Sequence, residues 1–536
     1  MLKSVSLQLL FILVSMAAYA NPVVLDVSDF GMKPNGGDST AALQKVLAVA
    51  KCAKGGAVVK FPKGRYDFGP NFAPEKYFFP ANNNEGLKRV IFNIDGFENI
   101  TFDGQGSAFV FHGFVNPFIV QNSKGVRFGN FSVDVFRSYH SEGKIIGCGK
   151  GWFEVEISEE FPFEIKNGFL RFIGKDDPLL WGKPADAEYA YQLLLEFNSE
   201  RRETAYNVGD YYGGCPLKAE KIGGRKVRIE HPRFVGKIGN IVVFQPVLRR
   251  YPAFIVDKSA DVSFEKLTIY AAGGMGILAQ NTHTVGVVGC KFTPSRGRIV
   301  SCTADATHFA NCSGKILLDG NLFENQMDDA TNIHGIYEQI ISIDGDTVFT
   351  RLVHPQQLGF ETFAAGQSVE FVAGDYPEVL IRNNVIRRNR ARGMLLNCRG
   401  RTVVENNLFQ SAGAALLFEG DASFWFEQGG VGDCLIRSNT FDNCKFGKWS
   451  RGIISVGSGV RAERETSRYN RNIKIENNVF NVFDATPILD VYCIDGLVWR
   501  GNKINRTKAY PARDIKNPEP FVIENCDNVE IDSVPN

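Results

Sequence analysis

The chain repeats a short pattern in which an asparagine precedes apolar, strand-forming residues. The clear copies are Asn383-Asn384-Val385-Ile386, Asn406-Asn407-Leu408-Phe409, Ser438-Asn439-Thr440-Phe441 and Asn477-Asn478-Val479-Phe480, flanked by Asn321-Leu322-Phe323 and Asn502-Lys503-Ile504. From Asn321 onward the marker asparagines are 63, 23, 32, 39 and 24 residues apart. The two shortest offsets suit one coil of a parallel β-helix. Asparagine also tolerates the left-handed backbone of a tight corner. Unrelated Asn-rich hairpins are the alternative, which six such copies disfavour.

Weaker copies extend this pattern toward the N-terminus, but at two places the distance between successive copies is much longer than one coil. Leu267 and Cys290 are 23 residues apart, and residues 99–104 and 128–132 look like two more coils. Phe131 to Leu267 spans 136 residues, however, and the step of 63 follows Asn321. Removing one coil of about 24 residues leaves excursions of roughly 110 and 40 residues. Strand-like pieces between glycine turns predict that both excursions are small inserted β-barrels.

The first 20 residues have the three parts of a signal peptide. Lys3 precedes the apolar run 9–16, and Ala18-Tyr19-Ala20 offers a small-residue cleavage site before Asn21. The apolar run is too short to span a bilayer. We therefore expect an exported protein without a membrane span, and both the periplasm and the medium stay open as its destination.

One amphipathic helix is expected near the mature N-terminus, because Asp38-Ser39-Thr40 is a helix start and apolar residues follow at helical spacing. A helix over the open end of a β-helix prevents edge pairing. The predicted fold is all-β: a right-handed parallel β-helix with an N-terminal capping helix and two inserted small β-barrel domains. The expected boundaries are 1–20 signal peptide, 21–135 cap and first coils, 136–245 inserted β-barrel, 246–335 coils with candidate catalytic residues, 336–372 second inserted β-barrel and 373–536 C-terminal coils.

Charge and cysteine usage narrow the function. The 60 Lys and Arg residues against 59 Asp and Glu leave a formal charge of +1, which gives no general attraction to nucleic acid or anionic membranes. The eleven cysteines show no spacing typical of a zinc site. We therefore expect an uncharged partner and neither a metal nor another cofactor. The oligomeric state does not follow from the sequence.

Two acidic clusters are the strongest candidates for chemistry. Asp305 precedes Asp328 by 23 residues and Asp329 by 24, which is one predicted coil. Residues one coil apart lie on adjacent strands about 4.8 Å apart, so the three carboxylates should share one face. Stacked carboxylates without a basic side chain between them repel each other, so at least one pKa should be raised, which would provide a proton donor. Strand alternation would separate Asp328 from Asp329 unless the chain bends there.

Simpler explanations exist for these residues and their neighbours. Surface turns or a Ca²⁺ site would also use clustered aspartates. The oversized corner 419–427 offers Trp425 for stacking on a sugar, with Glu419 or Glu427 accepting hydroxyl groups, although its aromatic residues could instead pack the loop. The arginines of 387–392 are typical of a solvated edge but could favour anionic sugars.

Together these features resemble glycoside hydrolase family 110, the bacterial α-1,3-galactosidases that remove galactose from blood group B antigens. The resemblance spans the mature chain and is sharpest at Asp305, at Asp328-Asp329-Ala330 and at Asn332-Ile333-His334-Gly335. It implies an inverting hydrolase of galactose-terminated oligosaccharides or glycoconjugates, without a cofactor. Asp328 would be the general acid, and Asp305 with Asp329 would hold and deprotonate the attacking water.

The same resemblance makes Asn332 and His334 candidate substrate contacts, together with the loop residues already named. Polygalacturonases also pair a lone aspartate with an Asp-Asp one coil later, but their Arg-Ile-Lys signature is absent here. Three functions therefore stay open: an exo-α-galactosidase, a hydrolase or lyase of acidic polysaccharide, and a non-catalytic β-helix adhesin. Fold alone does not separate them.

Overall fold

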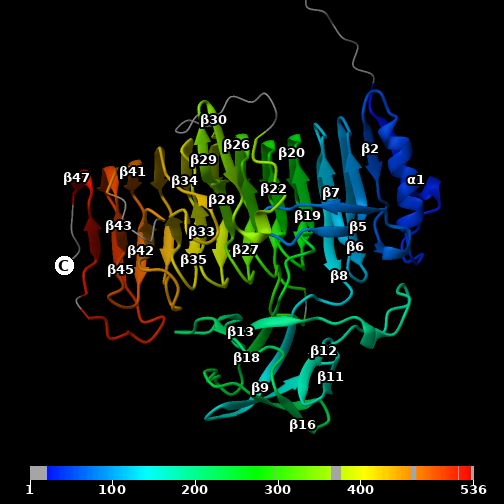
Figure 1. The fold of residues 1–536 in the computed structure, drawn as a ribbon, viewed down its shortest axis with the longest axis horizontal. Helices are drawn as coiled ribbons and strands as arrows, with labels where there is room; N and C mark the ends of the chain where they lie inside the picture. The colour runs from blue at the N-terminus through cyan, green and yellow to red at the C-terminus, as the bar shows by residue number, and fades with distance from the viewer. Residues whose placement is uncertain (1–20, 296, 364–375, 460–465, 517, 533–536) are drawn as a thin grey trace, which may run out of the picture.

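The structure is a computed structural model that describes residues 21–295, 297–363, 376–459, 466–516 and 518–532. The predicted signal peptide and residues 364–372 of the second predicted β-barrel lie outside these residues. The body is an elongated stack of parallel strands, and a separate antiparallel domain hangs from one side of it (Figure 1). The predicted parallel β-helix is confirmed.

Two sheets run along the stack. The larger one contains, within the described residues, β1 Val23–Asp26, β2 Ala57–Lys60, β3 Arg65–Phe68, β6 Ile100–Phe111, β8 Arg127–Val135, β20 Ala260–Glu265, β21 Thr268–Ile269, β23 His283–Val288, β24 Lys291–Phe292, β26 Ser313–Asp319, β27 Leu322–Glu324, β31 Glu378–Arg382, β32 Val385–Arg387, β34 Arg401–Glu405, β35 Leu408–Gln410, β38 Asp433–Arg437, β39 Thr440–Asp442, β41 Asn470–Glu476, β42 Val479–Val482, β44 Ile494–Arg500, β45 Lys503–Arg506 and β47 Asp527–Ile531. The second sheet contains β4 Glu75–Phe78, β5 Gly86–Asp95, β7 Asn116–Gln121, β19 Phe254–Asp257, β22 Ile277–Gln280, β25 Thr307–Ala310, β28 Thr331–Ile336, β33 Met394–Leu396, β36 Leu416–Phe418, β37 Glu427–Gln428, β40 Ile454–Val456, β43 Leu489–Tyr492 and β46 Phe521–Glu524.

The repeated asparagines form a continuous ladder between coils. Asn321 Nδ2 donates to Asn384 Oδ1 at 3.0 Å, and Asn384 Nδ2 donates to Asn407 Oδ1 at 2.9 Å. The same link then joins residues 407, 439, 478 and 502 in turn. The residue before each ladder asparagine from 384 to 478 has a positive φ, such as 57° at Asn383. The first position of the pattern therefore makes the corner, and the second joins it to the next coil.

The N-terminal end of the stack is closed by the predicted helix. Helix α1, Thr40–Lys51, buries Leu43, Val46, Leu47 and Ala50 against the first coils. Phenylalanines continue this core along the stack: the ring centroids of Phe92 and Phe118 are 4.3 Å apart. Short 3-10 turns at Val27–Phe30 and Pro70–Phe72 complete the cap.

The first excursion is a separate antiparallel domain, as predicted. Its strands are β9 Ser141–Gly149, β10 Trp152–Ile157, β11 Phe163–Lys166, β12 Phe169–Phe172, β13 Tyr191–Asn198, β14 Glu203–Thr204, β15 Tyr211–Tyr212, β16 Ala219–Gly223, β17 Lys226–Glu230 and β18 Ile241–Pro246, with a 3-10 turn at Pro184–Asp186. All of their pairings are antiparallel. The stack resumes beyond this domain in register, since Ser132 of β8 pairs with Thr268 of β21.

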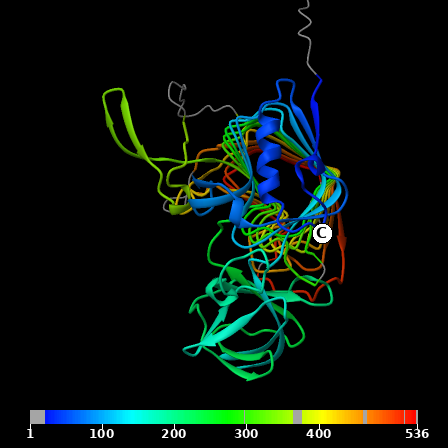
Figure 2. The same ribbon diagram turned by 90° about the vertical axis from the view of Figure 1, so that its right-hand side faces the viewer.

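The second excursion is described only in part. Its described residues form one antiparallel hairpin, β29 Gln339–Asp344 with β30 Thr347–Arg351, followed by the 3-10 turn Pro355–Gln357. The hairpin corresponds to two of the strands expected there, and it projects away from the stack (Figure 2). No closed barrel is present among the described residues of this segment, and residues 364–372 of the predicted barrel lie outside them.

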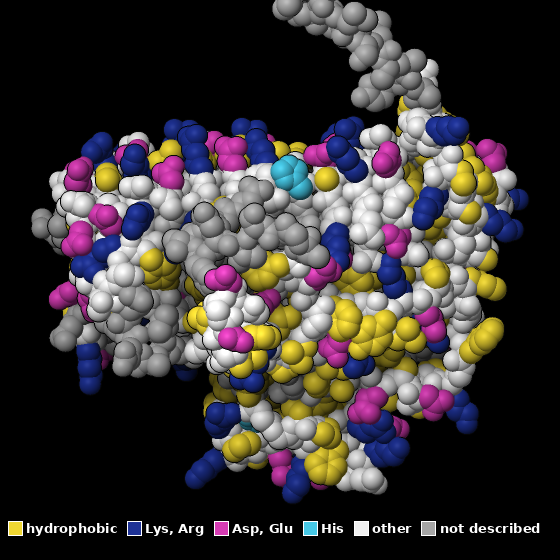
Figure 3. Space-filling model, turned by 45° about the horizontal axis from the view of Figure 1, so that its top comes forward, with side chains coloured by type: hydrophobic (Ala, Val, Ile, Leu, Met, Phe, Trp, Pro, Cys, Tyr) yellow, Lys and Arg dark blue, Asp and Glu magenta, His cyan; other side chains and the backbone are white. Residues whose placement is uncertain are grey.

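The surface carries both signs of charge. Figure 3 shows basic and acidic side chains interspersed over one face, and hydrophobic side chains gathered where the inserted domain meets the stack. This distribution agrees with the near-neutral formal charge. Among the described residues, no helix has the length and apolar character needed to cross a membrane.

Candidate active site

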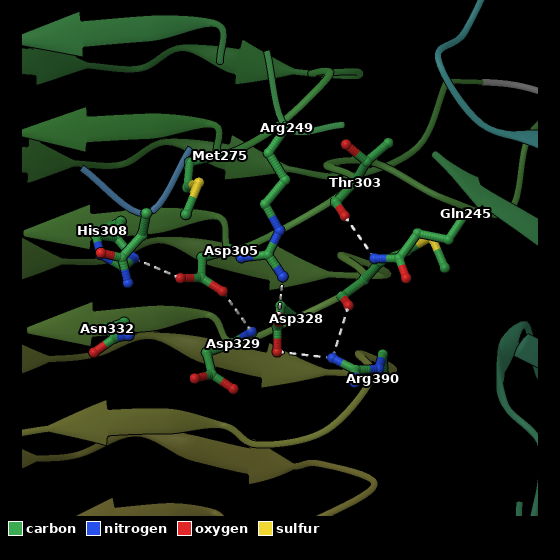
Figure 4. A network of polar contacts seen from close by, with 12 residues as sticks. Gln245, Arg249, Met275, Thr303, Asp305, His308, Asp328, Asp329, Asn332 and Arg390 are labelled. Atoms are coloured by element: carbon green, nitrogen blue, oxygen red, sulfur yellow. Dashed lines mark hydrogen bonds and ion pairs between the residues drawn. The ribbon is translucent and has the colours of Figure 1, made fainter. Parts of the chain in front are cut away.

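The three predicted aspartates come together at two successive corners of the stack. Asp305 lies in the irregular segment between β24 and β25, and Asp328 and Asp329 lie in the equivalent segment between β27 and β28. One carboxylate oxygen from each residue lies within 4.8 Å of the others. The expected bend is present, because residues 325–330 are outside regular strand. Both neighbouring aspartates therefore face the same site as Asp305 (Figure 4).

The three carboxyl groups differ in exposure and contacts. The side chain of Asp328 is 10% exposed, against 5% for Asp305 and 1% for Asp329. Asp305 Oδ1 accepts a hydrogen bond from the Asp329 backbone N–H at 3.1 Å. Among the described residues, nothing hydrogen-bonds to Asp329 Oδ2. Asp328 is thus the carboxyl group closest to solvent, and the other two lie behind it.

The expectation of an acidic cluster without basic neighbours is wrong. Three arginines contact Asp328: Arg249 Nη2 at 3.0 Å, Arg390 Nη1 at 2.9 Å and Arg392 Nη2 at 3.4 Å. Arg392 Nε also donates to Asp329 Oδ1 at 2.8 Å. Part of the predicted solvated edge therefore faces inward. Arg387 and Arg388 instead pair with Glu324 and stay partly exposed.

These contacts separate the pKa values of the trio. Burial and the nearby Asp328 raise the pKa of Asp305 to about 8. Burial also raises the pKa of Asp329 well above its usual range, aided by both neighbouring carboxylates and opposed by Arg392. For Asp328 the three arginines outweigh burial and hold the pKa below its usual value. The substrate-free site therefore has one ionised carboxylate at its opening and two proton-holding groups behind it.

Two buried histidines lie behind Asp305. His308 Nδ1 is 2.7 Å from Asp305 Oδ2, and His308 Nε2 is 2.8 Å from His334 Nε2. His334 Nδ1 donates to the Gly335 carbonyl oxygen at 2.6 Å. His334 was expected to contact substrate, but its side chain is fully buried and both ring nitrogens already have protein partners. His308 is a site residue that the sequence analysis missed.

The remaining predicted residues fall at different distances from the aspartates. Glu427 is buried, and its Oε1 accepts from Asn82 Nδ2 at 2.5 Å and from Asn332 Nδ2 at 3.4 Å. The strand pair β28–β37 brings it there. Trp425 lies at the rim, where the guanidinium of Arg249 is 5.6 Å from its ring centroid. Glu419 instead forms an ion pair with Arg451 at 2.9 Å, away from the trio.

Two sets of side chains have the geometry to hold a cation: the aspartate trio, and His308 with His334 and Glu427. In the second set the two facing Nε2 atoms are already close enough to share one proton. In the first set three guanidinium groups supply the positive charge that a cation would bring. Neither set requires a metal ion to explain its contacts.

The missed arginines left a signal in the sequence. Arg392 follows Asp329 by 63 residues, the same offset that separates the ladder asparagines 321 and 384 across the second excursion. Counting coils across that excursion would have placed Arg390 and Arg392 beside the acidic pair. Arg249 left no such signal, because it follows the inserted domain outside the regular coils.

Comparisons with known proteins agree with this architecture. Residues 141–242 match the family described as GLAA-B beta-barrel domain I, and residues 252–429 match the right handed beta helix region. The alpha-1,3-galactosidase A of Shewanella woodyi is 33% identical over 91% of this chain and 87% of its own length. The chain belongs to the α-1,3-galactosidase family, glycoside hydrolase family 110.

Other family 110 relatives align over most of the chain as well. The alpha-1,3-galactosidase B of Akkermansia muciniphila is 30% identical over 95% of this chain and 69% of its own length. Among solved structures, the family 28 exopolygalacturonase of Yersinia enterocolitica is 13% identical and covers 96% of this chain and 80% of its own, with a TM-score of 0.43. Family 110 membership makes the chain a glycoside hydrolase. The match to the right handed beta helix region confirms the predicted β-helix, and the match to the beta-barrel model falls within the first predicted insertion.

Proposed function

We propose that this chain is an exo-acting α-1,3-galactosidase that hydrolyses terminal α-1,3-linked galactose, with Asp305, Asp328 and Asp329 as its catalytic groups. The observation that carries the proposal is the convergence of three carboxyl groups from two successive coils within 4.8 Å. Their pKa values differ in direction, and glycoside hydrolysis needs a protonated group beside an ionised one. The names of the family relatives supply the sugar and the linkage.

The different exposures of the three carboxyl groups support a division of roles within the trio. Asp328 is the most exposed of the three and is placed to protonate the glycosidic oxygen. Asp305 and Asp329 are nearly buried and reach the sugar best through a water molecule held between them. A covalent nucleophile must touch the anomeric carbon directly. Two recessed carboxyl groups therefore favour attack by water and inversion.

Two features of the substrate-free site differ from the simplest inverting scheme. The nearest oxygens of the trio are closer than the roughly 6.5–9.5 Å that separates many inverting pairs. The arginines also keep Asp328 ionised. For Asp328 to act as the acid, substrate must separate it from Arg249, whose side chain is 20% exposed. Arg390 can keep its charge paired throughout, since Asp210 holds it at 2.5 Å.

The arginines also bear on the alternative substrate class. Arg390 and Arg392 are engaged by Asp210, Asp328 and Asp329, so neither offers a free charge to an acidic polysaccharide. This pairing favours a neutral galactoside over polygalacturonate.

The test is to incubate the protein with linear Galα1-3Gal and with branched blood group B oligosaccharide. Proton NMR in the first minutes, before mutarotation, should show β-galactose as the first product of an inverting enzyme. Asp305→Asn serves as the inactive control. Initial α-galactose would overturn inversion. Release of reducing ends from polygalacturonate, without galactose from either glycan, would overturn the proposed function.

We also propose export, on the signal-like pattern of residues 1–20. Expression with those residues in a bacterial host should yield a periplasmic or secreted protein that begins near Asn21. A cytoplasmic product with an intact N-terminus would contradict this.

A further inference from the structure

The donor and acceptor of each hydrogen bond of His308 and His334 can be assigned by starting at the Gly335 carbonyl. The partner of His334 Nδ1 is a carbonyl oxygen, which can only accept, so the proton of His334 lies on Nδ1. Burial lowers the pKa of His334, so the ring is neutral and its Nε2 carries no proton. His334 Nε2 is therefore the acceptor in its contact with His308.

The other links follow from this one. His308 Nε2 must donate to His334 Nε2 across 2.8 Å. Burial lowers the pKa of His308 to about 4, so this ring is also neutral and its Nδ1 accepts. The donor to Nδ1 is then Asp305 Oδ2, at 2.7 Å. Asp305 thus carries a proton in the substrate-free site, in agreement with its raised pKa.

In these two hydrogen bonds the donated protons point from Asp305 toward His334, and the Glu427 carboxylate lies near His334. Glu427 Oε1 is 3.7 Å from His334 Nε2 and is held by Asn82. A positive charge on His334 would therefore be stabilised by Glu427. The histidine side chains are 1% and 0% exposed, so bulk water does not reach the links between them.

We propose that His308 and His334 are positioning residues that form a proton relay, through which Asp305 accepts a proton from the attacking water. The inference rests on the proposed function. As the water oxygen bonds to the anomeric carbon, its O–H bond breaks and the proton goes to Asp305 Oδ1. The proton on Asp305 Oδ2 moves to His308 Nδ1, and the proton on His308 Nε2 moves to His334 Nε2.

This step balances without an ionised Asp305. The glycosidic C–O bond breaks with its electron pair on the leaving oxygen, which takes the proton of Asp328. The acid loses one proton and the relay gains one, so His334 ends as an imidazolium beside Glu427. Asp328 takes up its proton from solvent when substrate separates it from Arg249. After the product leaves, the relay runs in reverse and releases its extra proton to solvent through Asp305, which restores the site. The other charged groups facing the relay are Asp328, Arg249 and Arg392.

The relay is tested with His308→Asn, whose amide can retain a hydrogen bond to Asp305 but cannot pass a proton onward. We expect kcat on Galα1-3Gal to fall roughly 100-fold, within the range of general acid–base catalysis. KM and the thermal midpoint should change little, and the acid limb of the kcat/KM profile should move. His283→Asn, an exposed histidine outside the site, is the matched control and should match wild type.

A second measurement does not depend on turnover. Protein labelled with ¹⁵N-histidine should show by NMR at pH 7 an Nε2–H tautomer for His308 and an Nδ1–H tautomer for His334. Asp305→Asn should keep both, because its amide donates in place of the acid. An Nδ1–H tautomer at His308 would overturn the relay. So would a wild-type kcat and pH profile in His308→Asn while wild type releases galactose. If wild type releases no galactose, the proposed function fails. The tautomers of His308 and His334 still test the direction of the hydrogen bonds from Asp305 to His334.

Discussion

The assignment of Asp328 as the general acid predicts that its loss depends on the leaving group. Asp328→Asn keeps the shape of the side chain but removes the proton donor. On Galα1-3Gal, whose leaving oxygen needs protonation, kcat should fall roughly 100- to 10,000-fold, as for loss of a general acid. On α-galactosyl fluoride, whose leaving group needs little protonation, the same variant should lose less than about 100-fold, the bottom of that range.

The recessed carboxyl groups provide the matched controls. Asp305→Asn and Asp329→Asn leave the acid in place but impair activation of water, so each should lose activity on both substrates to a similar extent. Initial rates of galactose release for the three isosteric variants on the two substrates decide the assignment. Equal losses for Asp328→Asn on both substrates, or retained fluoride hydrolysis by Asp329→Asn, would refute it.

The arginines add a pH signature to this prediction. An acid catalyst must be protonated, and the three arginines lower the pKa of Asp328 in the free enzyme. The kcat/KM profile reports the free enzyme, and the kcat profile reports the complex with substrate. If substrate separates Asp328 from Arg249, the basic limb of kcat should lie at a higher pH than that of kcat/KM. Coincident basic limbs would show that the arginines stay in place during turnover.

Three further predictions concern the surroundings of the trio. The pKa of Asp305 is raised to about 8 from an ordinary value of about 4, so its contribution to stability is complete below pH 4 and is lost as the pH rises toward 8. Asp305→Asn should therefore flatten the decline of the thermal midpoint between pH 5 and 8, and an unchanged slope would contradict the shift. Trp425→Ala should raise KM for galactosides with little change in thermal midpoint, whereas a large drop in that midpoint at constant KM would make Trp425 a packing residue. Activity should survive EDTA because arginines already neutralise the trio, and a complete loss that Ca²⁺ reverses would instead indicate a metal site.

The parts of the fold that the sequence predicted are those specified by local repetition. From Asn384 onward, the steps of the asparagine ladder are less than two coils long, and α1 depends on one helical period. The aspartate trio was found for the same reason, because its members are one coil apart. For the second excursion, the prediction is borne out as far as the hairpin β29–β30. Alternation indicates strands, but it does not indicate how many of them close into a barrel.

What the sequence analysis missed depends on contacts that cross an insertion. Arg390 reaches Asp328 from 62 residues away, across the hairpin excursion. Arg249 reaches the same carboxylate from the end of the inserted domain. Without these arginines the charge state of Asp328 could not be predicted. An isolated acidic trio would raise the pKa of Asp328, whereas a trio with three arginines lowers it. Short-range periodicity does not show pairing across an excursion, and only the shared offset of 63 residues points to Arg392.

The architecture separates the reacting groups from the groups that surround them. Two adjacent coils hold the three carboxyl groups in a register fixed by backbone pairing, as between Thr307 and Thr331. The insertions supply the rest: Asp210 of the first inserted domain holds Arg390, and His354 of the second excursion packs 4.4 Å from the ring of Trp425. Both insertions therefore contact residues that surround the carboxyl groups, whereas the carboxyl groups themselves belong to the coils.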